Sequence, residues 1–171
     1  MSKGKAWKYG DDVNTDVIFP GKYTYSVLDA EEMAAHALED LDPEFALKVK
    51  PGDIVVAGKN FGCGSSREQA ATCLKHAGVR AVVAKSFARI FFRNAINQGL
   101  PVIQCSEAVD CIEAGEEISV DFSRGVIQTA KGVFDFVPLP DFILQILDAG
   151  GLIAFIKKKI ETEKNQGDCN A

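Results

Sequence analysis

The sequence predicts an α/β fold made of a parallel βαβαβ unit followed by antiparallel strands. Three short apolar runs rich in β-branched residues, at 53–57, 80–84 and 100–104, alternate with helical stretches at 66–77 and 87–98. Continuous apolar strands separated by helices are typical of a parallel sheet that is buried on both faces. This central unit therefore defines the fold class.

Shorter elements are expected on either side of the parallel unit. Asp29 followed by Glu31 and Glu32 predicts an N-cap with an acidic first turn, leading a short helix as far as Leu38. The other expected elements are strands at 117–122, 125–129 and 132–137 and helices at 138–147 and 152–159. We expect one domain over residues 1–160 and a polar, disordered C-terminal tail over residues 161–171.

Composition excludes several classes of protein. A length of 171 residues suits one domain with a substantial core. A net charge of -5 is unlike the basic surface that nucleic acid requires. No run approaches the ~20 apolar residues of a membrane span, and the N-terminus lacks the apolar core of a signal peptide. We therefore expect a cytoplasmic protein that binds neither nucleic acid nor membrane.

The five cysteines do not predict a metal site in this chain. They are odd in number and form no CxxC pair, at Cys63, Cys73, Cys105, Cys111 and Cys169. Their spacing also differs from that of iron–sulfur ligands. Any cluster would have to be held by another chain.

The segment NFGCGSSREQA, residues 60–70, is the strongest candidate for a functional site. It follows the strand at 53–57, and its glycines permit a close backbone approach to a ligand. The first N–H groups of a helix have no intrahelical partner, so a helix that begins here would attract a carboxylate or phosphate. Ser65 and Ser66 add hydroxyl donors, and Arg67 adds a planar guanidinium that matches a carboxylate.

The same residues also fit a helix cap that needs no ligand. Ser65 and Glu68 have the spacing of a capping box. The capping box does not explain the second serine or Arg67, a cation that would oppose the helix dipole in the first turn. An anion site and a bare cap therefore both stay open on the residues alone. The P-loop, GxGxxG and GxSxG motifs are absent, so nucleotide binding and a serine-hydrolase elbow are not indicated.

Three motifs in this sequence resemble the small-subunit, or swivel, domain of the aconitase superfamily. They are DDVNTDVIFPGKY at 11–23, NFGCGSSREQA at 60–70 and KSFARIFFRNAINQGLPVI at 85–103, and the likeness spans residues 7–160. A separate chain of this length is similar to small subunits of the 3-isopropylmalate dehydratase type, whose near relatives are homoaconitase and 2,3-dimethylmalate dehydratase. The resemblance implies a swivelling β/β/α domain and a hydro-lyase that interconverts 2- and 3-isopropylmalate by dehydration and rehydration, in leucine biosynthesis.

The resemblance also implies a division of labour between two chains. A separate large subunit, in a heterodimer or heterotetramer with this chain, would carry a [4Fe–4S] cluster that acts on the substrate as a Lewis acid. By motif position Ser65 would be the catalytic base, and Ser66 and Arg67 would bind a carboxylate of the hydroxy-dicarboxylate substrate. Asn60 and Asp16 would help to position the substrate, although both also suit plain turn residues.

The loop formed by Tyr23, Thr24, Tyr25 and Ser26 matches the segment at which members of this family select their substrates. Relatives that use tricarboxylates resemble this loop but place an arginine near the position of Tyr25. Without that arginine an extra carboxylate would be buried unpaired, whereas an apolar branch would gain about 0.8 kcal/mol per buried CH₂ on the aromatic rings. A branched malate is therefore favoured over citrate or homocitrate. Two other classes stay open, a non-catalytic carboxylate-binding module and a purely structural partner.

Overall fold

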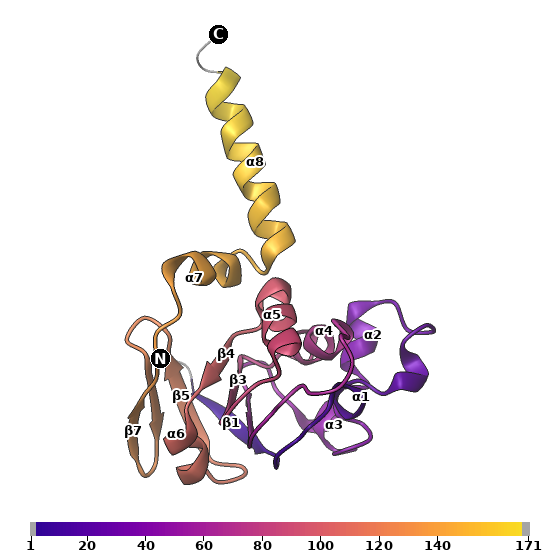
Figure 1. The fold of residues 1–171 in the computed structure, drawn as a ribbon, viewed down its shortest axis with the longest axis vertical. Helices are drawn as coiled ribbons and strands as arrows, with labels where there is room; N and C mark the ends of the chain where they lie inside the picture. Colours follow the sequence, from indigo (N-terminus) through magenta and orange to yellow (C-terminus); the bar gives the residue numbers. More distant parts are fainter. Residues whose placement is uncertain (1–2, 169–171) are drawn as a thin grey trace.

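The computed structural model describes residues 3–168 and, within them, the side chains up to residue 163 (Figure 1). The strands are β1 (Lys3–Lys8), β2 (Ile54–Ala57), β3 (Ala81–Ala84), β4 (Val102–Gln104), β5 (Glu117–Asp121), β6 (Val126–Thr129) and β7 (Gly132–Asp135). The helices are α1 (Thr15–Ile18), the 3₁₀ turn η1 (Gly21–Tyr23), α2 (Ala30–Ala34), α3 (Phe45–Lys48), α4 (Gln69–His76), α5 (Arg89–Gln98), α6 (Ser106–Cys111), α7 (Asp141–Asp148) and α8 (Leu152–Asp168).

All seven strands described join one sheet in the order β4-β3-β2-β1-β5-β6-β7. Strands β1 to β4 pair in parallel, whereas β1 pairs with β5, β5 with β6, and β6 with β7 in the antiparallel sense. The predicted combination of a parallel βαβαβ unit with antiparallel strands is confirmed. Strand β1 joins the two halves.

Strands β2 and β3 are apolar throughout because both faces of this part of the sheet are covered. Val55 and Ala57 of β2 face a core shared with α1 to α5 and α7. Ile54 and Val56 of the same strand face a second core that contains Ala108 of α6 and residues of β5 and β6. Side chains of a strand alternate between faces, so neither face leaves a polar position.

Some boundaries differ from those expected. Helix α4 begins at Gln69 rather than at residue 66, and α2 ends at Ala34 because the chain then turns repeatedly before Leu41. Its predicted cap is confirmed, since the Asp29 side chain accepts from the backbone N–H groups of Glu31 and Glu32. Strand β1 and helices α1 and α6 were not expected.

Helix α8 projects away from the rest of the molecule (Figure 1). It continues to residue 168, into the segment for which a disordered polar tail was expected, and residues 169–171 of that segment lie outside the described part. The division of the chain near residue 160 stays a prediction. Within the described residues no helix has the length and apolarity to cross a membrane.

Candidate active site

The glycine–serine turn that follows β2 is bound to a second turn that precedes α1. The N–H of Gly62 donates to the carbonyl of Val13 at 2.7 Å, and the N–H of Thr15 donates to the carbonyl of Cys63 at 2.8 Å. These two bonds act like one rung of a parallel sheet and join residues about 50 apart in sequence. The two motifs DDVNTDVIFP and NFGCGSSREQA therefore form one structural unit.

The buried side chain of Thr15 forms a hydrogen bond with the backbone of Ser65. The Thr15 hydroxyl donates to the carbonyl oxygen of Ser65 at 3.0 Å and lies 3.3 Å from the Ser65 hydroxyl oxygen. Thr15 is 1% exposed, whereas Ser65 and Ser66 are exposed. A buried hydroxyl thus fixes the backbone of Ser65 and leaves its side chain open to the surface.

Arg67 is held by Asp16 in an ion pair. The Arg67 side chain is about a quarter exposed, and that of Asp16 is about half exposed. Gly21 lies directly against the pair, because a Cβ atom at this position would be 3.0 Å from Nη1 of Arg67 and 3.2 Å from Oδ1 of Asp16. One carboxylate therefore orients the guanidinium while part of it stays accessible to an anion.

The predicted placement of Ser65 and Arg67 on a helix N-terminus is wrong. Helix α4 begins at Gln69, and its N-cap residue, Glu68, makes no side-chain capping bond. Instead the N–H of Arg67 donates to the carbonyl of Ser65 at 2.8 Å, in a tight turn that comes before the helix. The capping box is wrong for the same reason, since Ser65 is bound to Thr15 and stands too early to cap α4.

Asn60 has the left-handed backbone that its alternative role as a turn residue requires, with φ of 59°. Its side-chain amide donates to Oδ1 of Asp12 at 2.7 Å, and its backbone N–H donates to the Ser86 hydroxyl oxygen at 2.8 Å. Asn60 therefore shapes the start of the turn. A direct role toward substrate stays a prediction.

The turn packs on an aromatic cluster. The Phe61 ring makes edge contacts with the rings of Phe87 and Phe91, with ring centroids 6.2 and 5.1 Å apart. A Cβ atom at Gly62 would lie 2.1 Å from Cγ of Phe91, and Gly62 has φ of 77°. Only glycine fits at this position, and its absence of a side chain lets the turn pack directly on Phe91 of α5.

The four residues of the predicted substrate loop have different environments. Tyr25 is 93% exposed and Ser26 is also exposed, whereas Tyr23 is partly buried and its ring stacks on His36 at 3.8 Å. The loop backbone is closed by bonds from the N–H groups of Ser26 and Val27 to the carbonyl of Tyr23. Tyr25 is thus the aromatic ring of this loop that is free to meet another molecule.

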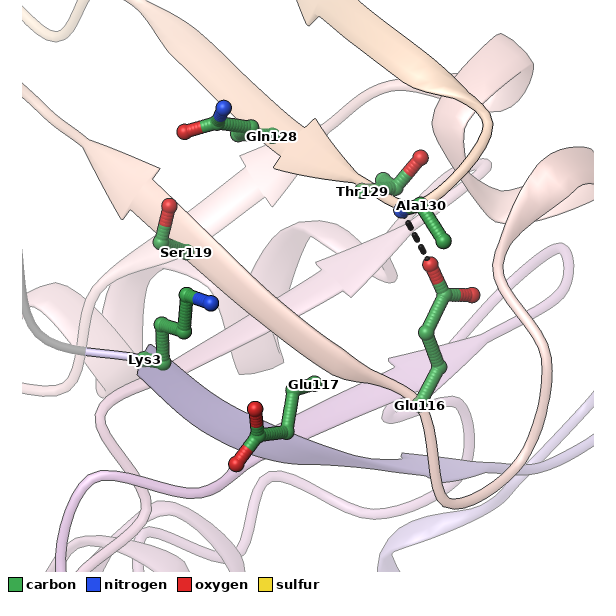
Figure 2. Close-up of a pocket in the computed structure, with 7 residues that line it drawn as sticks. All are labelled: Lys3, Glu116, Glu117, Ser119, Gln128, Thr129 and Ala130. Carbon is green, nitrogen blue, oxygen red and sulfur yellow. Dashed lines mark hydrogen bonds between the residues drawn. The ribbon is translucent and has the colours of Figure 1, made fainter.

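Ser65, Ser66 and Tyr25 are exposed, so the candidate site lies at the surface of this chain. The cavity drawn in Figure 2 has a volume of about 310 Å³ and is lined from β1, β5 and β6, without any of the predicted site residues.

In the described part of the chain no three His, Cys, Asp or Glu side chains are grouped to hold a metal ion. Burial and the nearby Asp12 raise the pKa of the Cys63 thiol, which is therefore neutral at neutral pH.

A family model for the aconitase C-terminal domain matches residues 15–108 of this sequence. The chain belongs to this family. The match covers Thr15, Asp16, the loop at 23–26 and the turn at 60–67. The aconitase C-terminal domain of this chain is therefore the part that carries the candidate site.

Curated relatives cover nearly the whole chain. A protein of Caldicellulosiruptor saccharolyticus named 3-isopropylmalate dehydratase small subunit is 55% identical over 163 residues, which is 94% of each chain. A 3-isopropylmalate dehydratase small subunit 1 of Archaeoglobus fulgidus is 56% identical over 90% of this chain and 96% of its own. A crystal structure of 3-isopropylmalate dehydratase from Methanocaldococcus jannaschii superposes with a TM-score of 0.89 at 43% identity, covering 96% of this chain and 98% of that one. The expected aconitase-superfamily fold is confirmed.

Thr15 and Gly21 were missed from the sequence, although both lie in the first motif. Thr15 stands among Val13, Val17 and Ile18, where a polar residue that is buried signals a specific bond. Gly21 follows Pro20, a pair that is typical of a turn and gives no sign of contact with an ion pair. Local spacing gives no sign of the Thr15–Ser65 or the Gly21–Arg67 contact, because each joins residues more than 40 apart in the sequence.

Proposed function

We propose that this chain is the small subunit of a hydro-lyase of the 3-isopropylmalate dehydratase type. It interconverts 2- and 3-isopropylmalate by dehydration and rehydration in leucine biosynthesis, together with a separate large subunit. The observation that carries the proposal is the 55% identity, over 94% of both chains, to a protein named as that small subunit. The arrangement of Ser65, Arg67 and Asp16 gives this chain the groups that such a reaction needs.

Ser65 is the proposed catalytic base, which removes and returns the carbon-bound proton. Ser65 is exposed, and its backbone carbonyl accepts a bond of 3.0 Å from the Thr15 hydroxyl, which holds the residue in place. A serine hydroxyl is a weak acid in water, and its anion becomes usable when water is excluded and cations or N–H donors surround it. Arg67 is the cation of this chain nearest in sequence to Ser65 and lies in the same turn.

Arg67 is the proposed clamp for a substrate carboxylate, with Ser66 as a further donor. Asp16 holds the guanidinium before substrate arrives, which reduces the side-chain entropy that binding must overcome. Ser66 precedes Arg67 in the sequence and is exposed, so its hydroxyl could donate to the same carboxylate. Asn60 shapes the turn from the other end.

The large subunit is the proposed partner and the carrier of a [4Fe–4S] cluster. Bound there, the cluster would supply a Lewis acid for the substrate hydroxyl and one carboxylate. The described residues of this chain hold no suitable group of ligands, and its relatives are named as small subunits. Ser65, Ser66 and Tyr25 are exposed, so the surface that encloses the substrate has to be completed by another chain.

Tyr25 supports a substrate with an apolar branch. It is 93% exposed and lies two residues after η1, whose first residue, Gly21, contacts the Arg67–Asp16 pair. An isopropyl group packed against this ring would be favourable, and no arginine stands in the loop for a third carboxylate. That the substrate is isopropylmalate and not dimethylmalate stays a prediction. The cytoplasmic location is also a prediction.

Reconstitution of the two subunits tests the proposal. The full chain is mixed without oxygen with a cluster-loaded large subunit, and formation of the unsaturated acid from 3-isopropylmalate is followed by absorbance. Turnover is expected from the mixture and from neither chain alone. A mixture that turns over none of the branched malates, citrate or homocitrate would show that this chain is a binding or structural partner.

Two substitutions then separate the roles at the site. Ser65→Ala is expected to abolish turnover while the subunits still assemble, as measured by size-exclusion chromatography. Arg67→Lys is expected chiefly to raise KM, because lysine loses the planar two-point contact with a carboxylate. A near-normal kcat for Ser65→Ala would remove serine as the base, and an unchanged KM for Arg67→Lys would remove the clamp.

A further inference from the structure

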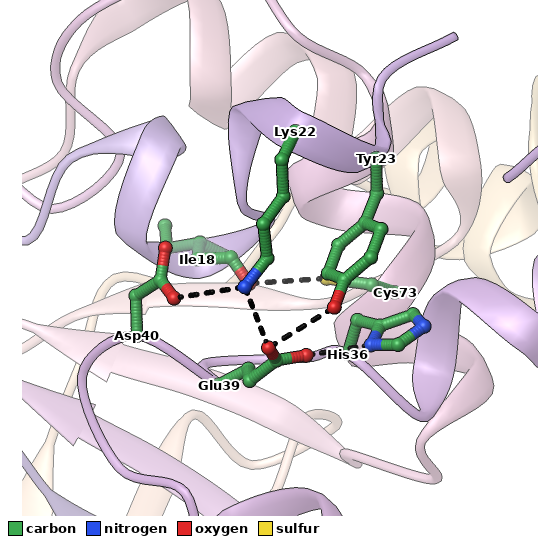
Figure 3. A network of polar contacts seen from close by, with 7 residues as sticks. All are labelled: Ile18, Lys22, Tyr23, His36, Glu39, Asp40 and Cys73. Atoms are coloured by element: carbon green, nitrogen blue, oxygen red, sulfur yellow. Dashed lines mark hydrogen bonds and ion pairs between the residues drawn. The ribbon is translucent and has the colours of Figure 1, made fainter. Parts of the chain in front are cut away.

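The loop at 23–26 continues from η1, and this longer loop, residues 21–26, is bound to the body of the protein through Glu39 (Figure 3). One carboxylate oxygen of Glu39 accepts from Nζ of Lys22 at 2.8 Å and from the hydroxyl of Tyr23 at 3.1 Å. The other oxygen lies 2.6 Å from Nδ1 of His36. Both oxygens of this one side chain are therefore engaged, and two of their three partners belong to the loop.

Ring contacts and a second ion pair support the same network. The Tyr23 ring stacks on the His36 ring with an interplanar angle of 24°, and Nζ of Lys22 lies 4.9 Å from the centre of the Tyr23 ring. Asp40 adds a second carboxylate 3.6 Å from Nζ of Lys22. The orientation of η1 is thus fixed by contacts on several sides of the Tyr23 ring.

An unusual backbone conformation presents Glu39 to the loop. The preceding residue, Leu38, has φ of 57°, a left-handed conformation that costs a bulky residue roughly 1–2 kcal/mol. Leu38 is fully buried, and its N–H donates to the carbonyl of Ile18 at 2.8 Å. That same carbonyl accepts from the thiol of Cys73 in α4. Strain of this kind persists where the surroundings impose it, and here it turns the next side chain toward η1.

The other end of the loop touches the proposed carboxylate clamp. Gly21 packs on the Arg67–Asp16 pair, and Lys22 and Tyr23 follow it directly on Glu39. The positions of Arg67 and Tyr25 relative to each other therefore depend on the short stretch that Glu39 holds. The hydrogen bond from Lys22, with that from His36, lowers the pKa of Glu39 to about 2, so its carboxylate is ionised throughout the physiological range.

We propose that Glu39 is a positioning residue, which sets the orientation of the loop from Gly21 to Ser26 and thereby places Tyr25 against the apolar branch of the substrate. The inference rests on the proposed function for the identity of that substrate. Glu39 acts through Lys22 and Tyr23 and does not touch the reacting atoms. Its removal therefore affects substrate fit more than the chemical step.

Glu39→Gln is the variant that tests this role, because glutamine keeps the size of the side chain and removes its charge. Glu44→Gln is the matched control, since Glu44 also pairs with a lysine, Lys48 at 2.7 Å, on the surface of α3 and away from the loop. Tyr23→Phe is a second test variant, which removes one donor to Glu39 and leaves the stacked ring.

The first measurement uses the isolated full chain and does not depend on turnover. Limited digestion with trypsin is followed by mass spectrometry for cleavage after Lys22. We expect Glu39→Gln to be cut there roughly fivefold faster than the wild type, at a temperature well below the unfolding midpoints of both proteins, because a freed loop fits a protease more readily. Glu44→Gln should be cut at the wild-type rate.

The second measurement uses the reconstituted enzyme with 3-isopropylmalate and with unbranched malate. In Glu39→Gln we expect KM for the branched substrate to rise roughly fivefold with kcat within a factor of two, and the preference for the branched acid to fall to a similar degree. Tyr23→Phe should shift the same quantities less. Equal losses in kcat and kcat/KM, or an unchanged substrate preference, would overturn the proposal. If the wild type turns over no branched malate, the proposed function fails, while unchanged cleavage in Glu39→Gln separately shows that Glu39 does not hold the loop.

Discussion

Replacing Thr15 with valine tests whether a buried hydroxyl positions the proposed base. Thr15 is 1% exposed, and its hydroxyl lies 3.0 Å from the carbonyl oxygen of Ser65 and 3.3 Å from its hydroxyl oxygen. Valine has nearly the same shape, so no cavity is created and the loss is that of one hydrogen bond, about 0.5–1.5 kcal/mol of stability. Since small displacements at a reacting centre are costly, we expect kcat of the reconstituted enzyme to fall about tenfold or more.

Thr15→Ser is the matched variant, because serine keeps the hydroxyl and loses the buried methyl group. Its free energy of unfolding should fall by about 1 kcal/mol, from the lost methyl group, while its kcat should stay near that of the wild type. Urea unfolding of the isolated chain and absorbance assays of the mixed subunits give the two quantities. If Thr15→Ser loses as much activity as Thr15→Val, then packing and not the hydroxyl positions Ser65, and the reasoning is refuted.

Three further predictions follow from buried or charged contacts elsewhere. Asp53→Ala should lower the free energy of unfolding, measured in urea, by about 2–4 kcal/mol. The buried carboxylate accepts from the Trp7 indole N–H at 2.9 Å and from two backbone N–H groups, and alanine removes all three bonds. Asp53→Asn keeps one acceptor and should lower the free energy of unfolding less. Gly21→Ala should raise KM without a comparable loss of stability, because the added Cβ would stand 3.0 Å from Nη1 of Arg67; an unchanged KM would mean that the ion pair adapts. The pKa of Glu39 is lowered from 4.5 to about 2 in the folded chain, so its contribution to the free energy of unfolding should be fully present above pH 4.5 and be lost as the pH falls toward 2. The free energies of unfolding of the wild type and Glu39→Gln should therefore converge in acid. A constant difference between them would contradict the lowered pKa.

The parallel half of the sheet was predictable because burial on both faces leaves a strong mark on sequence. Strands β2 and β3 read IVVA and AVVA, with all eight residues buried. Strand β1 reads KGKAWK and was missed, since half of its residues are exposed and a glycine stands within it. Its place beside β2 is settled by long-range pairing and by the buried Asp53, neither of which a local pattern contains.

The start of α4 shows why a local motif can mislead. Ser65 and Glu68 have capping-box spacing, but Gly64 has φ of 99° and Ser65 is bound to Thr15, 50 residues earlier. These contacts bind residues 64 and 65 to the turn before α1, so helix α4 begins only at Gln69. The chemical types of the site residues could therefore be predicted from the motif, whereas their geometry depends on tertiary contacts.

Preorganisation and exposure together determine what this chain contributes to the reaction. Thr15, Asp16 and the Glu39 network fix the turn, the guanidinium and the loop before any ligand is present. Yet Ser65 is open to water, and in water its hydroxyl has no useful basicity, because the anion is stabilised only by donors in a site from which solvent is excluded. On the proposed function, the turn around Ser65 is chemically inert until another surface covers it, which fits a small subunit that is a separate chain. It also explains why turnover is expected from the mixture alone, since assembly supplies the enclosure that this fold leaves out.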